Sequence, residues 1–199
     1  MRWDLINYLV EQNNYQRYLE VGVQDYYCNC DKIKADYKYA VDPAPRNKCD
    51  FVGTSDAFFN QHEPSEKFDI IFIDGLHHSD QVLKDINHSL NILEEGGTIV
   101  VHDCLPEHEQ EQTKHMGEGA WTGDVWKTIV HLRGTRPDLE IRTVDHDWGC
   151  GIIRRGSQEL IKKYEMEQLT WPMYQQNRDQ LLGVISYVDF LNLYENVKA

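Results

Sequence analysis

The chain has 199 residues, of which 33 are acidic and 20 basic, so its formal net charge is −13. This balance argues against a partner that is nucleic acid or an anionic membrane, because phosphate binding needs clustered Lys and Arg. Hydrophobic residues make up 41% of the chain, which is enough for a folded core, and no apolar run approaches the roughly 20 residues of a membrane span. We expect a cytoplasmic protein of one domain, residues 1–199.

The first half of the chain alternates short β-rich segments with helical patterns, which is typical of βαβ units and a mainly parallel sheet. In chain order, the pattern predicts a helix over 3–13, a strand over 18–23, a helical stretch near 25–35, strands at 38–41 and 50–52, and a helix around 55–61.

The middle of the chain carries the clearest signals. Residues 68–73 form a nearly continuous apolar run, as expected for a strand buried on both faces. Ser79 is expected to cap the next helix, Gly96 and Gly97 to end it, and residues 98–101 to form another buried strand. The polar segment 104–121 is rich in His and Glu and is long enough to suggest a functional loop, such as a lid.

The last part of the chain is expected to hold a helix near 124–133 and an antiparallel hairpin of strands at 139–144 and 150–154. Helical patterns at 157–168 and 174–195 would form a C-terminal helical extension, residues 157–199, beside a core of about 15–155. An apolar stripe in this extension could cover a pocket or pair with a second copy as a homodimer; it comprises Leu181, Leu182, Ile185, Val188 and Leu191. Together these elements predict an α/β fold with a doubly wound sheet.

Ligands of such sheets bind outside the carboxyl ends of the strands, so polar residues there are candidate site residues. Glu20 and Gly22 close the first strand, where a glycine allows a tight turn and Glu20 can accept a hydrogen bond, although the GxGxxG pattern is absent. Asp42 ends the second strand, where an acid can bind both ribose hydroxyls or simply start a turn. Ser55 and Asp56 after the third strand could contact an adenine amino group or begin a helix.

A second group of polar residues closes the fourth and fifth strands. Asp74 and His77 follow the fourth, and His102 and Asp103 follow the fifth. If these strands are neighbours, their carboxylates and imidazoles converge, which suits Mg²⁺, Mn²⁺ or a similar divalent cation. His77 could then act as a general base near neutral pH. The alternative is a hydrogen-bonded network that only holds the loops in place.

These segments resemble successive motifs of class I S-adenosylmethionine (SAM)-dependent methyltransferases. The likeness is to the bacterial small-molecule O-methyltransferase branch, whose fourth motif reads Asp-Gly-x-His before a long helix. It covers about residues 15–155 and is carried by Tyr18–Val23, Val41-Asp42-Pro43, Thr54-Ser55-Asp56, Phe72–His77 and Ile99–Asp103. The resemblance implies a Rossmann-like sheet of seven strands in the order 3-2-1-4-5-7-6, with strand seven antiparallel.

The resemblance also implies SAM as cofactor. Glu20 and Gly22 would lie beside its methionine part, Asp42 on the ribose, and Ser55 and Asp56 near the adenine.

For the acceptor side, the resemblance implies that Asp74, which also contacts the cofactor, holds Mg²⁺ or another divalent cation together with His102 and Asp103. His77 would be the catalytic base. The sequence departs from the family at His102, where the metal-dependent relatives have a carboxylate. This change leaves either a softer metal or no metal at the site.

The expected reaction is therefore O-methylation of a small molecule, such as a sugar or another hydroxyl compound. Two other enzyme classes stay open on the residues alone. A nicotinamide-dependent oxidoreductase could use Asp42 on its ribose, and a metal-dependent hydrolase could use the His and Asp cluster. A binding protein that kept the fold without the chemistry is a further alternative.

Overall fold

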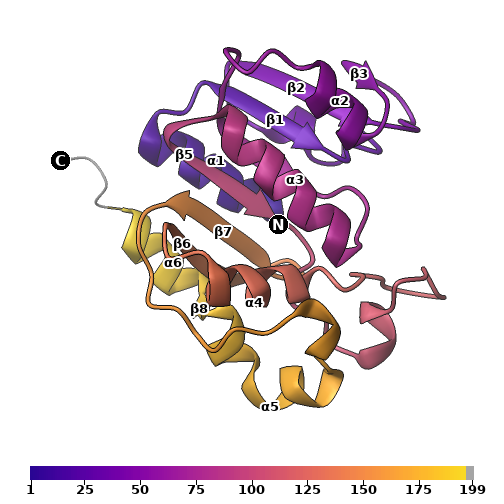
Figure 1. Cartoon of the computed structure of the whole chain (residues 1–199). Helices are drawn as coiled ribbons and strands as arrows, with labels where there is room; N and C mark the ends of the chain where they lie inside the picture. Colours follow the sequence, from indigo (N-terminus) through magenta and orange to yellow (C-terminus); the bar gives the residue numbers. More distant parts are fainter. Residues whose placement is uncertain (196–199) are drawn as a thin grey trace.

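The computed structural model describes residues 1–195 and contains an eight-stranded sheet in the order β3-β2-β1-β4-β5-β7-β6-β8 (Figure 1). The strands are β1 Arg17–Val21, β2 Tyr37–Asp42, β3 Phe51–Val52, β4 Phe68–Ile73, β5 Leu93–Val101, β6 Leu139–Asp145, β7 Cys150–Arg155 and β8 Val184–Ser186. The helices are α1 Arg2–Asn13, α2 Ser55–Gln61, α3 Ser79–Ile92, α4 Trp126–Thr135, α5 Trp171–Leu182 and α6 Tyr187–Tyr194. Short 3₁₀ turns occur at Cys30–Lys32, Glu109–Gln112 and Met166–Gln168.

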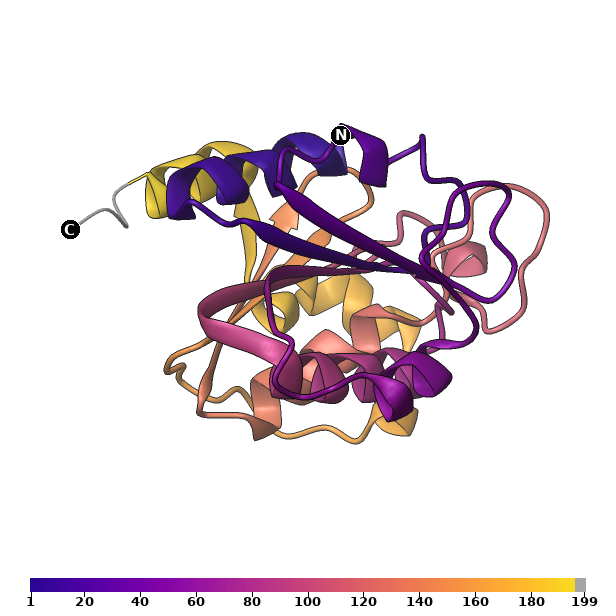
Figure 2. The ribbon, with the colours of Figure 1, turned by 90° about the horizontal axis from the view of Figure 1, so that it is seen from above.

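Apolar side chains cover both faces of the sheet, because successive residues of a strand point to opposite sides. In β4, Ile71 and Ile73 pack with α2, α3, α4 and α5, whereas Ile70 and Phe72 pack with α1 and α6. Figure 2 shows α1 and α6 side by side on one face of the sheet and the other helices on the opposite face. The predicted doubly wound α/β architecture is confirmed.

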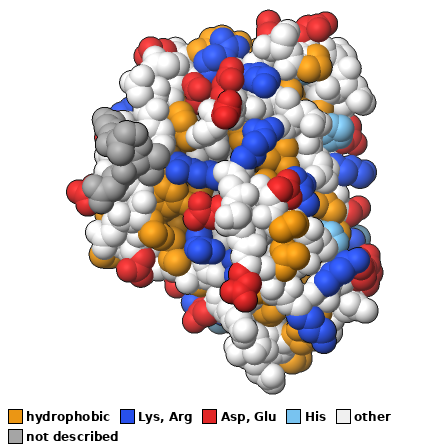
Figure 3. Space-filling view, turned by 60° about the vertical axis from the view of Figure 1, so that its left-hand side comes forward, with side chains coloured by type: hydrophobic (Ala, Val, Ile, Leu, Met, Phe, Trp, Pro, Cys, Tyr) orange, Lys and Arg blue, Asp and Glu red, His pale blue; other side chains and the backbone are white. Residues whose placement is uncertain are grey.

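The order of the first seven strands agrees with the prediction, and β7 runs antiparallel to both β5 and β6. The predicted strand count was one too low, because β8 adds an eighth strand parallel to β6. No helix among residues 1–195 is long and apolar enough to cross a bilayer. On the face shown in Figure 3, acidic and basic side chains are interspersed, so the excess negative charge is not gathered there.

The C-terminal part differs most from the prediction. The helix expected at 157–168 is absent, and this segment has no regular secondary structure except for the short 3₁₀ turn Met166–Gln168. Its polar groups bond to α4 instead: Ile161 N donates to the carbonyl of Arg133 at 3.2 Å, and Gln158 Nε2 to that of Arg136 at 2.9 Å. Contacts with a neighbouring helix therefore override the local helical pattern.

The single helix expected at 174–195 is interrupted at Gly183, whose φ of +59° suits glycine. The chain then enters β8 and starts again as α6. Leu181 and Leu182 of the predicted stripe are buried in the core, whereas Ile185 lies in β8 and Val188 is exposed. The stripe is therefore not one helical face. Residues 196–199 of the predicted extension lie outside the described residues.

Two smaller predictions also need correction. The stretch near 25–35 contains only the 3₁₀ turn Cys30–Lys32, because side-chain hydrogen bonds such as that from Asn47 Nδ2 to Asp25 Oδ1 hold the segment in a loop. Helix α3 ends at Ile92, and the Gly96–Gly97 pair lies inside β5 rather than ending the helix.

Candidate active site

A cavity of about 770 Å³ opens at the carboxyl ends of β1, β2, β4 and β5. The loops that follow these strands lie together on the right of Figure 2, beside the 104–121 segment. All nine candidate residues predicted from the sequence line this cavity: Glu20, Gly22, Asp42, Ser55, Asp56, Asp74, His77, His102 and Asp103. Their convergence follows from the parallel pairing of β1 with β2 and β4, and of β4 with β5.

Glu20 lies at the end of β1 and is buried. Its Oε2 accepts hydrogen bonds from the hydroxyl of Tyr18 at 2.6 Å and from Nδ2 of Asn29 at 3.1 Å. Burial raises the pKa of Glu20 to about 7, and these hydrogen bonds only partly offset that effect. Asn29 Oδ1 is buried without a hydrogen-bond partner. The niche therefore offers a carboxylate and an unused carbonyl acceptor to a ligand.

Gly22 directly follows β1 and packs against the backbone that follows β4. Its φ is +93°, and a Cβ at this position would overlap the backbone of Asp74 and Gly75. A glycine is therefore required here for the packing of two loops of the protein itself.

Asp42 accepts two backbone hydrogen bonds, from Gln24 N at 2.9 Å and from Ala44 N at 2.7 Å. The turn-forming role that the sequence suggested is thus present, and the side chain also lines the cavity. Gln24 itself has a φ of +43°, which is uncommon for a residue other than glycine. Strained backbone of this kind is common at functional sites.

The start of α2 supplies the third set of predicted residues. Thr54, rather than Ser55, caps the helix, because its Oγ1 accepts a hydrogen bond from Ala57 N at 3.2 Å. Ser55 and Asp56 occupy the first turn, and Asp56 Oδ1 accepts a hydrogen bond from Gln81 Nε2 at 3.0 Å. A carboxylate at a helix N-terminus is stabilised there by the helix dipole.

Helix α3 begins one residue earlier than expected. Ser79 was predicted to be its N-cap, but His78 occupies that position. Ser79 N, one of the unpaired donors of the first turn, is satisfied from another part of the chain by Asp124 Oδ1 at 2.7 Å. This bond ties the start of α3 to the segment that precedes α4.

Asp74, His77, His102 and Asp103 form a compact cluster. His77 Nε2 lies 3.3 Å from Asp74 Oδ1, and its Nδ1 lies 3.2 Å from Asp103 Oδ2. His102 Nδ1 lies 3.4 Å from Asp74 Oδ1 and 3.2 Å from Asp103 Oδ1. Each imidazole therefore stands between the same two carboxylates.

The charges of this cluster shift one another's pKa values. Burial opposes protonation of both rings, but Asp74 and Asp103 outweigh it and raise the pKa of His77 and, to about 10, that of His102. Burial alone would raise the pKa of Asp74, yet the neighbouring His102, His77 and Arg2 lower it well below its ordinary range. Opposite charges in a desolvated site have this effect on each other.

The cluster also has the donor arrangement of a cation site. Single ligand atoms of Asp74, His102 and Asp103 all lie within 4.8 Å of one another. Nδ1 of His102 is buried and has no hydrogen-bond partner, although it points between the two carboxylates. Two carboxylate oxygens and one imidazole nitrogen fit a divalent cation such as Mn²⁺, provided that the imidazole gives up its proton when the cation binds.

Arg2, at the start of α1, also lines the cavity and was missed by the sequence reasoning. Its Nη2 lies 3.7 Å from Asp74 Oδ2, and its Nη1 lies 3.4 Å from His102 Nε2. Arg2 is far from both residues in the sequence, so no local motif indicates the contact. Asn29 was missed because its segment was expected to be helical.

The 104–121 segment lies against His77. The indole of Trp121 stacks on the imidazole with ring centroids 4.8 Å apart and an interplanar angle of 16°. Gly123 follows with a φ of +58°, and a Cβ there would overlap the backbone of His77. Trp121, Met116 and Gly119 also line the cavity. This segment therefore forms one wall of the site next to His77.

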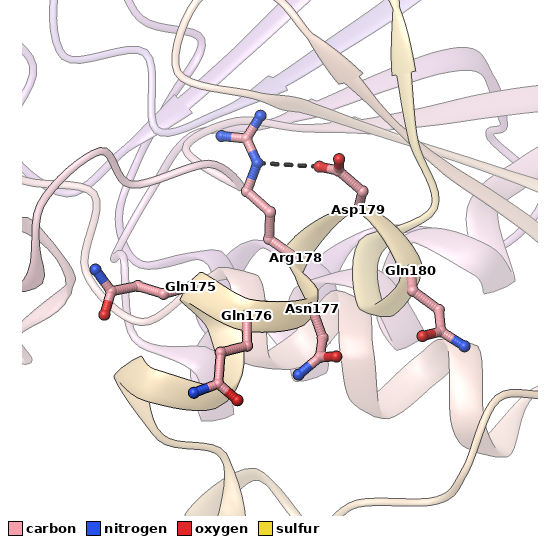
Figure 4. A pocket seen from close by; sticks show the side chains of 6 residues that line it. All are labelled: Gln175, Gln176, Asn177, Arg178, Asp179 and Gln180. Atoms are coloured by element: carbon pink, nitrogen blue, oxygen red, sulfur yellow. Dashed lines mark hydrogen bonds and ion pairs between the residues drawn. The ribbon is translucent and has the colours of Figure 1, made fainter.

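A second hollow, of about 330 Å³, lies along α5 and is lined by Gln175–Gln180 (Figure 4). One of its lining residues, Asn177, departs from helical backbone geometry. The close-up shows side chains that point in different directions, with Arg178 bonded to its neighbour Asp179 at 3.0 Å. The hollow has no converging functional groups.

Comparisons with known proteins point to methyltransferases. Residues 11–104 match a family model described as a methyltransferase domain. The fold is similar to that of the O-methyltransferase TomG from Streptomyces achromogenes, solved with SAM, at 14% identity, a TM-score of 0.57, and coverage of 78% of this chain and 80% of that one. It is also similar to an O-methyltransferase from Bacillus cereus, solved with S-adenosylhomocysteine (SAH), at 12% identity, a TM-score of 0.54, and coverage of 78% and 80%.

A third similar structure is the SAH-bound methyltransferase PaMTH1 of Podospora anserina, with 15% identity, a TM-score of 0.53 and coverage of 78% of each chain. No curated protein sequence matches the chain. Neither the oxidoreductase nor the hydrolase alternative finds support in these comparisons. Residues 11–104 are thus similar to a methyltransferase domain, and the fold of the chain is similar to that of SAM- and SAH-bound methyltransferases.

Proposed function

We propose that the chain transfers a methyl group from SAM to a hydroxyl oxygen of a small molecule, with His77 as the general base. The observation that carries this proposal is the position of His77 between Asp74 and Asp103, in a cavity that also holds the ribose-type acid Asp42. A volume of about 770 Å³ suits a nucleoside-sized cofactor together with a small acceptor.

On the cofactor side, we assign Glu20 and Gly22 to the methionine part, Asp42 to the ribose, and Ser55 and Asp56 to the adenine end. Asp74 would contact the cofactor at its border with the acceptor. Support comes from their common cavity and from the SAM- and SAH-bound proteins of similar fold. When bound, SAM supplies a methyl group that is already activated by its sulfonium.

On the acceptor side, the protein must align the hydroxyl and remove its proton. His77 would accept that proton, and Asp74 and Asp103 would stabilise the resulting imidazolium, since both already raise the pKa of His77. Trp121 would exclude water from the imidazole on which it stacks. A divalent cation, when bound, would be held by Asp74, His102 and Asp103 and would polarise the hydroxyl.

The acceptor is expected to be a sugar or another hydroxyl compound. The predicted homodimer, the cytoplasmic location and the single-domain organisation, with its core at about 15–155, stay predictions.

Two measurements test the function. Calorimetry with the full chain should show binding of both SAM and SAH. A panel of sugars and phenols incubated with SAM should then yield a methylated product detectable by mass spectrometry. Absence of SAM and SAH binding at millimolar concentration would contradict the proposal. Binding without transfer to any acceptor would favour the binding-protein alternative.

A further inference from the structure

Arg2 stands among acidic side chains. Its Nη2 lies 3.7 Å from Asp74 Oδ2, and its Nη1 lies 3.8 Å from Asp147 Oδ2. An arginine side chain stays protonated throughout the pH range in which proteins are folded. Arg2 is therefore a permanent cation whose surroundings are strongly negative.

The fold holds this cation in place. The backbone N of Arg2 donates to Asp147 Oδ2 at 2.6 Å, and Leu5, Ile6 and Leu9 anchor α1 in the core on one face of the sheet. The guanidinium makes no hydrogen bond to Asp74, and its Nε is buried without any partner. Arg2 therefore acts on Asp74 through its charge, and its one hydrogen bond to the cluster goes from Nη1 to His102 Nε2.

The same guanidinium touches two of the three proposed cation ligands. Besides its approach to Asp74, its Nη1 lies 3.4 Å from His102 Nε2. The opposite ring nitrogen, Nδ1 of His102, is the buried and unpartnered atom that points between the carboxylates. A divalent cation at this position would meet a fixed positive charge in contact with two of its ligands, and like charges repel strongly where water is largely excluded.

We propose that Arg2 is the resident cation of this cluster and that it prevents a divalent cation from binding tightly among Asp74, His102 and Asp103. The guanidinium balances the carboxylates in the place where a metal ion would otherwise do so. This inference rests on the proposed cation ligands of the same site.

The test is Mn²⁺ binding to the full chain without cofactor, measured by electron paramagnetic resonance and by calorimetry. Wild type is expected to bind Mn²⁺ only weakly, with a dissociation constant in the millimolar range or above. Arg2→Met keeps an unbranched apolar stem and removes the charge, so it should bind Mn²⁺ at least about tenfold more tightly. Arg2→Lys keeps the charge and should resemble wild type.

Two controls locate the effect. Arg178→Met causes the same change in net charge on the surface, where Arg178 pairs with Asp145 and Asp179, and should leave Mn²⁺ binding unchanged. Adding Asp103→Asn to Arg2→Met should abolish the new site.

Three results would overturn the inference: tight Mn²⁺ binding by wild type that Asp103→Asn removes, equal affinity in Arg2→Met and Arg178→Met, or a tighter site that survives Asp103→Asn. The first needs no Arg2 variant, so the inference stays testable if Arg2→Met does not fold. Because no cofactor or acceptor is present, failure here is distinct from failure to transfer methyl groups.

Discussion

The two sides of the cavity hold their acidic side chains by different means. On the cofactor side, Asp42 accepts hydrogen bonds from the backbone of Gln24 and Ala44, and Asp56 accepts one from the amide of Gln81. On the acceptor side, Asp74 and Asp103 face the two imidazoles, and Asp74 also faces the guanidinium of Arg2.

This difference matches the chemistry proposed for each side. Carboxylates fixed by neutral donors present constant acceptors, which suits hydroxyl groups of a bound nucleoside. Carboxylates that face imidazoles interact with groups that gain or lose a proton near neutral pH, and such an arrangement suits proton transfer. Substitutions on the acceptor side should therefore change rate, and substitutions on the cofactor side should change affinity.

His77→Ala is expected to have the largest effect. Loss of the base should lower kcat by about 10²–10⁴-fold while the dissociation constant of SAH changes little. Product formation and SAH calorimetry give the two quantities. The control is His78→Ala, since His78 bonds to the carbonyl of Lys114 and does not line the cavity. A variant at position 77 with unchanged kcat would remove His77 as the base.

Glu20→Gln tests a buried acid on the cofactor side. The folded chain raises the pKa of Glu20 from an ordinary 4.5 to about 7, so the wild-type side chain favours folding below pH 4.5 and loses this contribution as pH rises through about 7. The two values correspond to roughly 3 kcal/mol. As pH rises from about 4.5 to above 7, the free energy of unfolding in urea should therefore increase for Glu20→Gln relative to wild type, by up to that amount.

Wild-type affinity for SAH should rise with pH over the same range in which wild-type stability falls. An ionised Glu20 attracts the ammonium group of SAH, so wild-type affinity should fall as pH drops below about 7. Glu20→Gln should bind SAH more weakly and without this dependence. Asp85→Asn is the matched control, because burial raises the pKa of Asp85 to about 6 but Asp85 does not line the cavity. It should change stability with pH and leave SAH binding unaltered.

Much of the cofactor side could be predicted from sequence, because its residues directly follow strands that the apolar pattern reveals. Because β1 pairs in parallel with β2 and β4, the carboxyl ends of these strands lie at the same edge of the sheet, and so do Glu20, Asp42 and Asp74. The convergence of His77 with Asp103 follows in the same way from the pairing of β4 and β5.

The remaining features depend on contacts that no local pattern encodes. Arg2 reaches Asp74 only because α1 packs across one face of the sheet, and the apolar stripe of α1 predicts burial without predicting which strand end it approaches. The break at Gly183 depends on Arg133, whose guanidinium donates to the carbonyls of Leu181 and Ile141. A helical pattern cannot reveal a long-range partner of this kind.

Gly123→Ala tests how the backbone positions His77. A Cβ at this position would meet the backbone of His77, and the φ of +58° disfavours any side chain. We expect a loss of about 1–3 kcal/mol in the free energy of unfolding together with a lower kcat. Gly96→Ala is the control, because Gly96 has a φ of +76° and no neighbour within 4 Å. It should destabilise the chain without lowering kcat.

Asp42→Asn should have the smallest effect and should act on affinity alone. If Asp42 binds ribose hydroxyls, the dissociation constants of SAH and of adenosine should both rise by roughly tenfold, or about 1.4 kcal/mol, because both ligands carry the ribose. Asp25→Asn is the control, since Asp25 also lines the cavity but bonds to Asn47 and the backbone of Tyr27. If Asp42→Asn binds SAH and adenosine as tightly as wild type but melts at a lower temperature, Asp42 only stabilises the turn through its hydrogen bonds with Gln24 and Ala44. The contrast between an affinity side and a rate side would then have to rest on Glu20 and Asp56.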